Sequence, residues 1–268
     1  MPRVRGTTLR LALLVLLAVA ISSSCPLTTD ASSSDLQRFQ IGERLSYALS
    51  WGKISAGTAV LEVVGHGILG GRQVLQLLHT ARTNDFVSFF YPVNNRVESF
   101  IDEEALPARL LFNRREGKRK NDIEVLFDQA AHRALVTTDG VSETIVVPAG
   151  VQDTLSCLYA FRSLPLSAVG ESVSIDVYHD KKIYKLELRV EGFERMRTTL
   201  GEVDTIRVLA IMPFRGLFLN EGNIRVWFTN DTARIPVLMR AKVVIGSISA
   251  TLTSLRENVS LTKRGTRP

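Results

Sequence analysis

Apolar and polar residues alternate with a period of two along most of this chain, which is the pattern of strands that bury one face against a core. Glu43–Trp51 and Gly57–Val64 show this alternation. Short turns join neighbouring stretches, so the strands should pair mostly antiparallel. Further strands are predicted at Gln73–Thr83, Arg96–Asp102, Pro107–Arg115, Asp122–Asp128, Leu135–Thr138, Thr144–Val147, Ser172–His179, Lys182–Glu191, Val203–Met212, Asn223–Thr229, Val237–Ile245 and Ser247–Leu255.

The number of predicted strands, about a dozen, decides the fold class. A sheet of that size in one domain leaves its edges exposed unless it curls. We therefore predict a mainly β protein, built as a single curled antiparallel sheet or an incomplete β-barrel with one packed helix. No internal repeat or linker divides the chain, so we expect one domain.

The helix is predicted at Asp153–Leu164. Asp153 is a good N-cap, because its carboxylate accepts hydrogen bonds from the free amides of the first turn. Pro165 ends the helix, since proline cannot continue the hydrogen-bond ladder. The apolar residues fall on one stripe that must pack against the sheet. They are Leu155, Cys157, Leu158, Phe161 and Leu164.

The first 24 residues have the order of a signal peptide for export. A basic region with three arginines precedes a continuous apolar run, Leu11–Ile21, and three serines follow. That run is too short for an ordinary membrane-spanning helix. The rest of the chain is divided into a flexible tether at 25–38, a β-rich domain at 39–257 and a basic, frayed C-terminal tail at 258–268.

Cys25, directly after the signal peptide, resembles the lipid-acceptor cysteine of bacterial lipoproteins. Ser22 stands where the lipoprotein pattern has leucine, and Ala18-Val19-Ala20 is an ordinary cleavage site. Lipid attachment at Cys25 and simple cleavage are therefore both open. If Cys25 carries lipid, Cys157 is a lone buried thiol, and a Cys25–Cys157 disulfide is the other arrangement.

The net charge of +6 does not describe the exported domain. Three of the 33 basic residues lie in the signal peptide and three lie in the C-terminal tail, which leaves 27 basic against 27 acidic residues. A balanced body lacks the basic face that binds nucleic acid. We therefore expect no nucleic-acid partner.

No motif identifies a catalytic, cofactor or metal site. Gly65–Gly70 spells G-x-G-x-x-G, but a strand follows it instead of a helix, so we predict a glycine-rich hairpin. The four histidines lack metal-ligand spacing, and no G-x-S-x-G is present. A hydrolase with a site assembled from distant residues stays a third functional hypothesis, because catalytic triads are defined by geometry.

Two apolar segments near predicted strand ends are the candidate binding surface. Their side chains either cap the open ends of the core or form the mouth of an apolar cavity or a membrane contact. The charged turn Arg114–Lys120 is either a solvated hairpin tip or a contact for anionic lipid headgroups. The apolar candidates are Phe86, Phe89, Phe90 and Tyr91 in the first segment and Phe214, Leu217 and Phe218 in the second.

Several ordered motifs resemble a bacterial family catalogued as domain of unknown function 3108. They are F-x-I-G-E-R-L-x-Y and S-W-G-x-I-x-A-G within 39–57, R-V-E-S-F-I-D at 96–102, D-T-L-S-C-L-Y-A-F-R at 153–162, V-W-F-T-N-D-T-A-R-I-P-V at 226–237 and I-G-S-I-S-A-T-L at 245–252. The resemblance implies an exported, β-rich envelope protein, with no activity or catalytic residue to carry over.

Eight residues match these motifs, and we interpret them as fold determinants. Arg162 stands among apolar helix neighbours, so it should have a carboxylate partner. Asp231 and Arg234 are candidates to brace a turn before Pro236. The eight are Trp51, Gly57, Asp153, Arg162, Trp227, Asp231, Arg234 and Pro236.

Together these patterns favour an envelope protein, periplasmic or anchored to the outer membrane on its periplasmic side. It would bind a lipid or another apolar ligand in the concave face of its sheet without catalysing a reaction, and it would need no cofactor. The alternative is a scaffold or accessory protein of envelope assembly that acts through a surface patch. Membrane association is expected only through lipid on Cys25.

Overall fold

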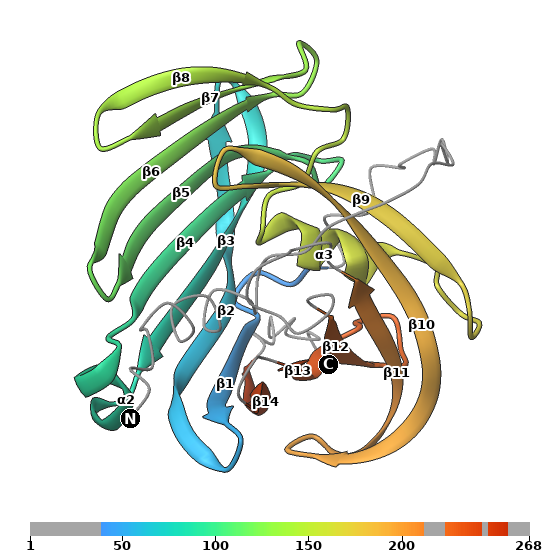
Figure 1. Cartoon of the computed structure of the whole chain (residues 1–268). Helices are drawn as coiled ribbons and strands as arrows, with labels where there is room; N and C mark the ends of the chain where they lie inside the picture. The colour runs from blue at the N-terminus through green and yellow to red at the C-terminus, as the bar shows by residue number, and fades with distance from the viewer. Residues whose placement is uncertain (1–38, 212–222, 243–245, 257–268) are drawn as a thin grey trace, which may run out of the picture.

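Fourteen strands form one sheet, and every neighbouring pair of strands is antiparallel (Figure 1). The computed structural model describes residues 39–211, 223–242 and 246–256; the predicted signal peptide, tether and C-terminal tail lie outside these ranges. The predicted fold class is confirmed. The strands are β1 Arg44–Trp51, β2 Ile54–Leu69, β3 Arg72–Thr83, β4 Asn94–Ile101, β5 Pro107–Glu116, β6 Arg119–Asp128, β7 Arg133–Thr138, β8 Val141–Val146, β9 Ser172–His179, β10 Lys182–Thr198, β11 Gly201–Ile211, β12 Ile224–Thr229, β13 Pro236–Lys242 and β14 Ser247–Arg256.

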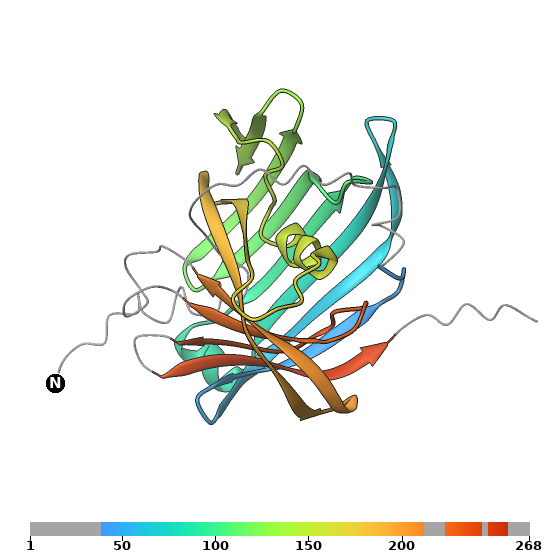
Figure 2. The ribbon, with the colours of Figure 1, turned by 90° about the vertical axis from the view of Figure 1, so that its right-hand side faces the viewer.

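The sheet consists of two meanders, β1–β8 and β9–β14, which join where β1 pairs with β14. Alternate residues along most strands face the interior, as the period-two pattern predicts. On β1, for example, Leu45, Tyr47 and Leu49 are 1, 1 and 2% exposed. The sheet curls around these side chains, and Figure 2 shows strands of both meanders around a common interior.

The curled sheet does not close into a barrel, because its two edge strands, β8 and β9, do not pair with each other. The segment before helix α3 (Ser156–Ser163) covers part of the β9 edge instead. Gln152 forms a parallel bridge with Val177, and its carbonyl accepts a 2.8 Å hydrogen bond from the amide of Tyr178. Phe127 also packs edge-on against Tyr178, with ring centroids 5.7 Å apart. These contacts protect an edge that would otherwise be open to pairing.

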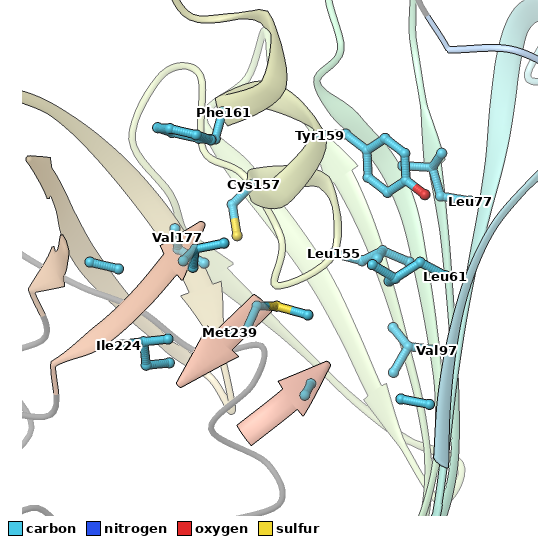
Figure 3. Packing of buried hydrophobic residues seen from close by; sticks show 14 of the residues in the cluster. Leu61, Leu77, Val97, Leu155, Cys157, Tyr159, Phe161, Val177, Ile224 and Met239 are labelled. Carbon is cyan, nitrogen blue, oxygen red and sulfur yellow. The ribbon is translucent and has the colours of Figure 1, made fainter. Parts of the chain in front are cut away.

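Helix α3, Ser156–Ser163, lies inside the curled sheet (Figure 2). It starts later than predicted, because residues 154 and 155 form the turn that leads into it. The carboxylate of Asp153 caps this turn by accepting from the amides of Leu155 and Ser156, at 2.6 and 2.8 Å. Figure 3 shows the helix packed on both sides: Leu155 and Tyr159 point toward β2–β4, whereas Cys157 and Phe161 point toward β9, β12 and β13.

A second helix, α2 at Asp85–Phe90, joins β3 to β4 and was not predicted. The side chain of Asn84 caps it by accepting from the amide of Val87 at 3.0 Å. With six residues the helix is too short to show helical periodicity in the sequence, so the segment appeared only as an apolar run. Among the helices of the described residues, none is long and apolar enough to cross a bilayer.

The G-x-G-x-x-G sequence is a hairpin, as predicted. Gly65 to Leu69 complete β2, and Gly70 and Gly71 form the turn to β3 with φ angles of +58° and +80°. No helix begins at this loop to present its amides to a phosphate group.

Candidate functional site

Three phenylalanines of α2 form an exposed aromatic cluster. Phe86, Phe89 and Phe90 are 61, 85 and 66% exposed. Their rings pack on one another, with centroids 5.8 Å apart for Phe86 and Phe90 and 5.1 Å apart for Phe89 and Phe90. Val87 and Tyr91 are 4 and 5% exposed, so these two side chains belong to the core. The four aromatic residues predicted as one group therefore separate into Tyr91, which closes the core, and three that face solvent.

The geometry of α2 explains this division. Val87 and Tyr91 are four residues apart and lie on one face of the helical turn, and the three phenylalanines occupy the opposite face. Asn84 fixes the start of the helix to β2, because its amide donates to the carbonyl of Ala56 at 3.0 Å and its side chain donates to the carbonyl of Ser55 at 2.7 Å. The phenylalanines are thus held outward by a tethered helix.

The β5–β6 turn is attached to the other end of α2. The amide of Gly117 donates to the carbonyl of Pro92 at 2.8 Å, and Gly117 has a φ of +56°. A Cβ on Gly117 would lie 2.5 Å from the ring of Tyr91, so only glycine fits this position without a shift. The basic turn predicted at 114–120 therefore lies beside the exposed phenylalanines.

Not all of the cations in the basic turn are available. Arg114 is 4% exposed and pairs with Asp180 at 3.3 Å, and Arg115 pairs with Asp122 at 2.8 Å. Lys118, Arg119 and Lys120 are exposed, and within the described residues they form no ion pair. The turn thus offers three free positive charges to solvent.

The base of this turn is a buried polar contact. Asn95 donates to the carboxylate of Glu116, and its side-chain oxygen accepts from the amide of Arg115 at 2.9 Å. Burial raises the pKa of Glu116, although the hydrogen bond from Asn95 and the nearby Arg114 oppose that change. The contact holds β4 and β5 in register at the edge that carries the free cations.

The β1–β2 turn adds Lys53 and Ile54, both exposed, to the same end of the molecule. In an antiparallel meander alternate turns lie on one edge, so the turns after β1, β3 and β5 are neighbours. The order of the predicted strands already implied that these turns share one edge of the sheet. Lys53 and Ile54 were nevertheless not among the predicted site residues, because neither is distinctive by itself. We call residues 52–54, 85–92 and 116–120 the α2 rim. Phe214, Leu217 and Phe218, the other predicted apolar candidates, lie outside the described residues.

The concave face, where the sequence placed a ligand, is occupied by α3. An apolar cavity of about 50 Å³ remains between α3 and β10–β13. Pockets that hold small organic ligands usually measure about 300–1,000 Å³. Cys157, Leu158, Phe161, Val208, Ile224 and Met239 are among its lining residues.

The motif residues lie mainly in buried contacts. The carboxylate partner of Arg162 is Glu43, which accepts from both terminal nitrogens at 2.7 Å, and the Nε of Arg162 donates to the carbonyl of Ala233 at 3.1 Å. Asp231 braces the turn before Pro236 by accepting from the amides of Ala233 and Arg234, at 3.1 and 3.0 Å.

Three further motif residues also have defined contacts. The side chain of Arg234 donates to the carbonyl of Leu166 at 2.7 Å, and the carbonyl of Pro236 accepts from the hydroxyl of Tyr47 at 2.8 Å. Trp51 ends β1 opposite Ile248. Trp227 is also buried, at 7% exposure, but it faces the outer side of the sheet, where its indole nitrogen donates to Glu194 at 2.6 Å.

Within the described residues, one hydroxyl and one carboxylate meet in the interior of the sheet. Ser99 donates to the carboxylate of Asp153, and both residues are 0% exposed. Burial raises the pKa of Asp153, opposed by its hydrogen bond from Ser99. Burial also lowers the pKa of His79 to about 4. In the part of the chain that the structure describes, no three histidine, cysteine or acidic side chains gather as metal ligands would.

A solved structure shares the fold at low sequence identity. A β-barrel-like protein of domain of unknown function DUF1849 from Brucella abortus matches with a TM-score of 0.53 and 11% identity, covering 82% of this chain and 98% of the other. That likeness shows the fold alone. A protein proposed to be exported, with a YmcC-like fold, from Bacteroides fragilis gives a TM-score of 0.37 at 10% identity and covers 82% and 97%.

The Mycobacterium tuberculosis lipoprotein LppX gives a TM-score of 0.25 at 10% identity, covering 85% of this chain and 96% of the other, which is too low to compare function. No curated protein matches the sequence. A family model described as protein of unknown function (DUF3108) matches residues 46–253.

Proposed function

The chain belongs to the DUF3108 family of proteins of unknown function, and from the geometry we propose that it is an exported envelope protein that binds lipid surfaces without catalysing a reaction. The observation that carries the proposal is the exposed cluster of Phe86, Phe89 and Phe90 beside three cations of the α2 rim that form no ion pair with any residue the structure describes. An aromatic surface of this kind bordered by basic residues is typical of proteins that lie on a membrane.

The size of the rim supports reversible binding. Burying a whole phenylalanine side chain contributes about 1.5–3 kcal/mol. Since each of the three rings is 61–85% exposed, full insertion would contribute roughly 1–2 kcal/mol per ring. Each nearby Lys or Arg adds about 1 kcal/mol at an anionic surface. Together these terms favour attachment that salt weakens, not permanent insertion.

The rim also fits the predicted route of the protein. The signal peptide at 1–24 predicts export, and Cys25 is the candidate for a lipid anchor. If Cys25 carries the acyl chains of a lipoprotein, these would anchor the chain, and the basic aromatic rim would be a further contact with the membrane surface. If the chain is simply cleaved, the rim would be its principal attachment.

The rim is a better candidate than the concave face for a physical reason. α3 fills the interior with fully buried side chains, such as Leu155 and Tyr159 at 0 and 1% exposure. An acyl chain could enter only if α3 moved, at the cost of this packing. The rim needs no such movement.

Vesicle sedimentation tests the proposal. The Phe86→Ser, Phe89→Ser double variant should lose most binding to vesicles that contain phosphatidylglycerol in phosphatidylcholine. The matched control is Ile68→Ser, Val146→Ser, which removes two side chains that are 73 and 84% exposed elsewhere on the sheet. The control should bind as the unmodified chain does, and both variants should have the thermal unfolding midpoint of the unmodified chain.

Equal binding by the two double variants would overturn the assignment of the rim. If the unmodified chain binds no vesicle of any composition, the scaffold hypothesis becomes the better explanation, because an exposed apolar cluster then needs a protein partner.

A further inference from the structure

The outer face of β10–β13 carries an open groove of about 660 Å³. It lies on the opposite face of the sheet from α3, because Trp227 lines the groove while its neighbours Val226 and Phe228 face the interior. Four arginines and one glutamate border it. They are Arg189, Arg207, Arg225, Arg240 and Glu191.

The strand register places three of these arginines in one row across the sheet. Arg189 is opposite Leu209, Leu209 is opposite Arg225, and Arg225 is opposite Arg240. Side chains directly opposite on neighbouring strands have Cβ atoms about 4.5–5.5 Å apart, and like charges there destabilise the sheet. The facing positive charges of Arg225 and Arg240 therefore destabilise the sheet, and a bound anion would reduce this repulsion.

The carboxylates near the groove position the arginines but do not neutralise them all. Glu191 accepts from Arg225 at 2.7 and 2.9 Å and from Arg207 at 3.1 Å, so one acid serves two guanidinium groups. Glu194 accepts from Arg207 at 2.7 Å and from the indole nitrogen of Trp227 at 2.6 Å. These bonds hold the groove wall in one arrangement.

Arg240 is the least neutralised of the four. Its guanidinium lies over the ring of Trp227, 5.7 Å from the centroid, and its Nε donates to the hydroxyl of Ser249 at 3.4 Å. No carboxylate within the described residues pairs with it. Arg240 is exposed and lines the groove, where a guanidinium fork suits an oxyanion.

We propose that this groove binds the phosphate group of a phosphate ester, with Arg240 and Arg225 as the principal contacts and Trp227 and Leu209 beneath the carbon part of the ligand. The juxtaposition of Arg225, Arg240 and Trp227 carries the proposal. It does not depend on the function proposed for the α2 rim. The ester is either a lipid headgroup or a soluble phosphorylated compound, since both present the same group.

Titration of the mature chain with inorganic phosphate and with glycerol 3-phosphate, in phosphate-free buffer at low salt, tests the site through tryptophan fluorescence and calorimetry. Binding should be tighter for glycerol 3-phosphate, and Arg240→Gln should weaken it about tenfold or more. The control is Arg195→Gln, which removes an exposed arginine of β10 that pairs with Asp204 at 2.9 Å. That variant should bind as the unmodified chain does.

A vesicle measurement separates the two sources of the phosphate. It uses vesicles with phosphatidic acid and the Phe86→Ser, Phe89→Ser background, which reduces the aromatic contribution of the α2 rim. If the chain binds these vesicles and Arg240→Gln abolishes the binding, the ligand is a lipid headgroup. If the chain binds glycerol 3-phosphate but not the vesicles, the ligand is a soluble ester. Absence of binding in both measurements, or equal loss in Arg240→Gln and Arg195→Gln, would overturn the proposal.

Discussion

Replacing Arg162 by Met should strongly destabilise the fold, because it leaves the carboxylate of Glu43 buried without its partner. The side chains of Arg162 and Glu43 are 2 and 4% exposed, and both N–O distances are 2.7 Å. Removing one member of a buried pair costs about 3–5 kcal/mol. The lost contacts of the guanidinium with the rings of Phe39 and Tyr159, 5.1 and 5.2 Å away, act in the same direction.

Urea unfolding followed by circular dichroism measures this cost. With a dependence on urea of about 3 kcal/mol per molar, the midpoint should fall by roughly 1–2 M. The control, Arg195→Met, breaks a pair whose side chains are 66 and 63% exposed, and such pairs contribute at most about 1 kcal/mol.

The double variant Arg162→Met, Glu43→Leu isolates the charge effect. Without either charge the interior no longer holds an unpaired ion, so much of the lost stability should return. The reasoning is refuted if Arg162→Met costs less than about 1 kcal/mol, or if the double variant is less stable than the two single variants predict together.

Two further predictions concern His79 and Gly57. Burial lowers the pKa of His79 from 6.5 to about 4, so the folded chain binds fewer protons between these values and stability falls as pH falls through that window. From pH 7 to pH 5 the free energy of unfolding should fall by about 2 kcal/mol. His79→Leu should flatten the slope of the urea midpoint against pH. An unchanged slope would contradict the lowered pKa of His79. Gly57→Ala should prevent stable folding, because a Cβ there collides with the carbonyl of Arg82, whereas Gly140→Ala, with nothing within 4 Å, should cost only about 1 kcal/mol in thermal unfolding.

The local pattern of the sequence was sufficient for the strands and for α3. Period-two alternation follows from the geometry of an extended backbone, so stretches such as Glu43–Trp51 could be assigned without knowing their partners. The cap at Asp153 and the stop at Pro165 are equally local. The expected curl of the sheet also followed from strand number alone, because a long open sheet has edges that must be protected.

The candidate sites were only partly predictable. The apolar run 86–93 and the basic turn 114–120 were both visible, but their adjacency depends on the contact between Gly117 and Pro92. The helical geometry of α2 decides which aromatic side chains face solvent. Tyr91 points inward and Phe89 points outward. The sequence predicted that the helix packs against the sheet, but it did not decide whether α3 or a ligand fills the concave face.

Contacts between distant residues were decided by the tertiary structure. Glu43 and Arg162 are 119 residues apart, and nothing near either position indicates the other. Trp227 was interpreted as a fold determinant from its motif, and only the structure showed that it lies on the outer face beneath Arg240. The sequence by itself determined which segments are strands, because backbone geometry imposes that periodicity. Only the folded sheet decided which side chains meet, because cross-strand register brings them together from separate parts of the chain.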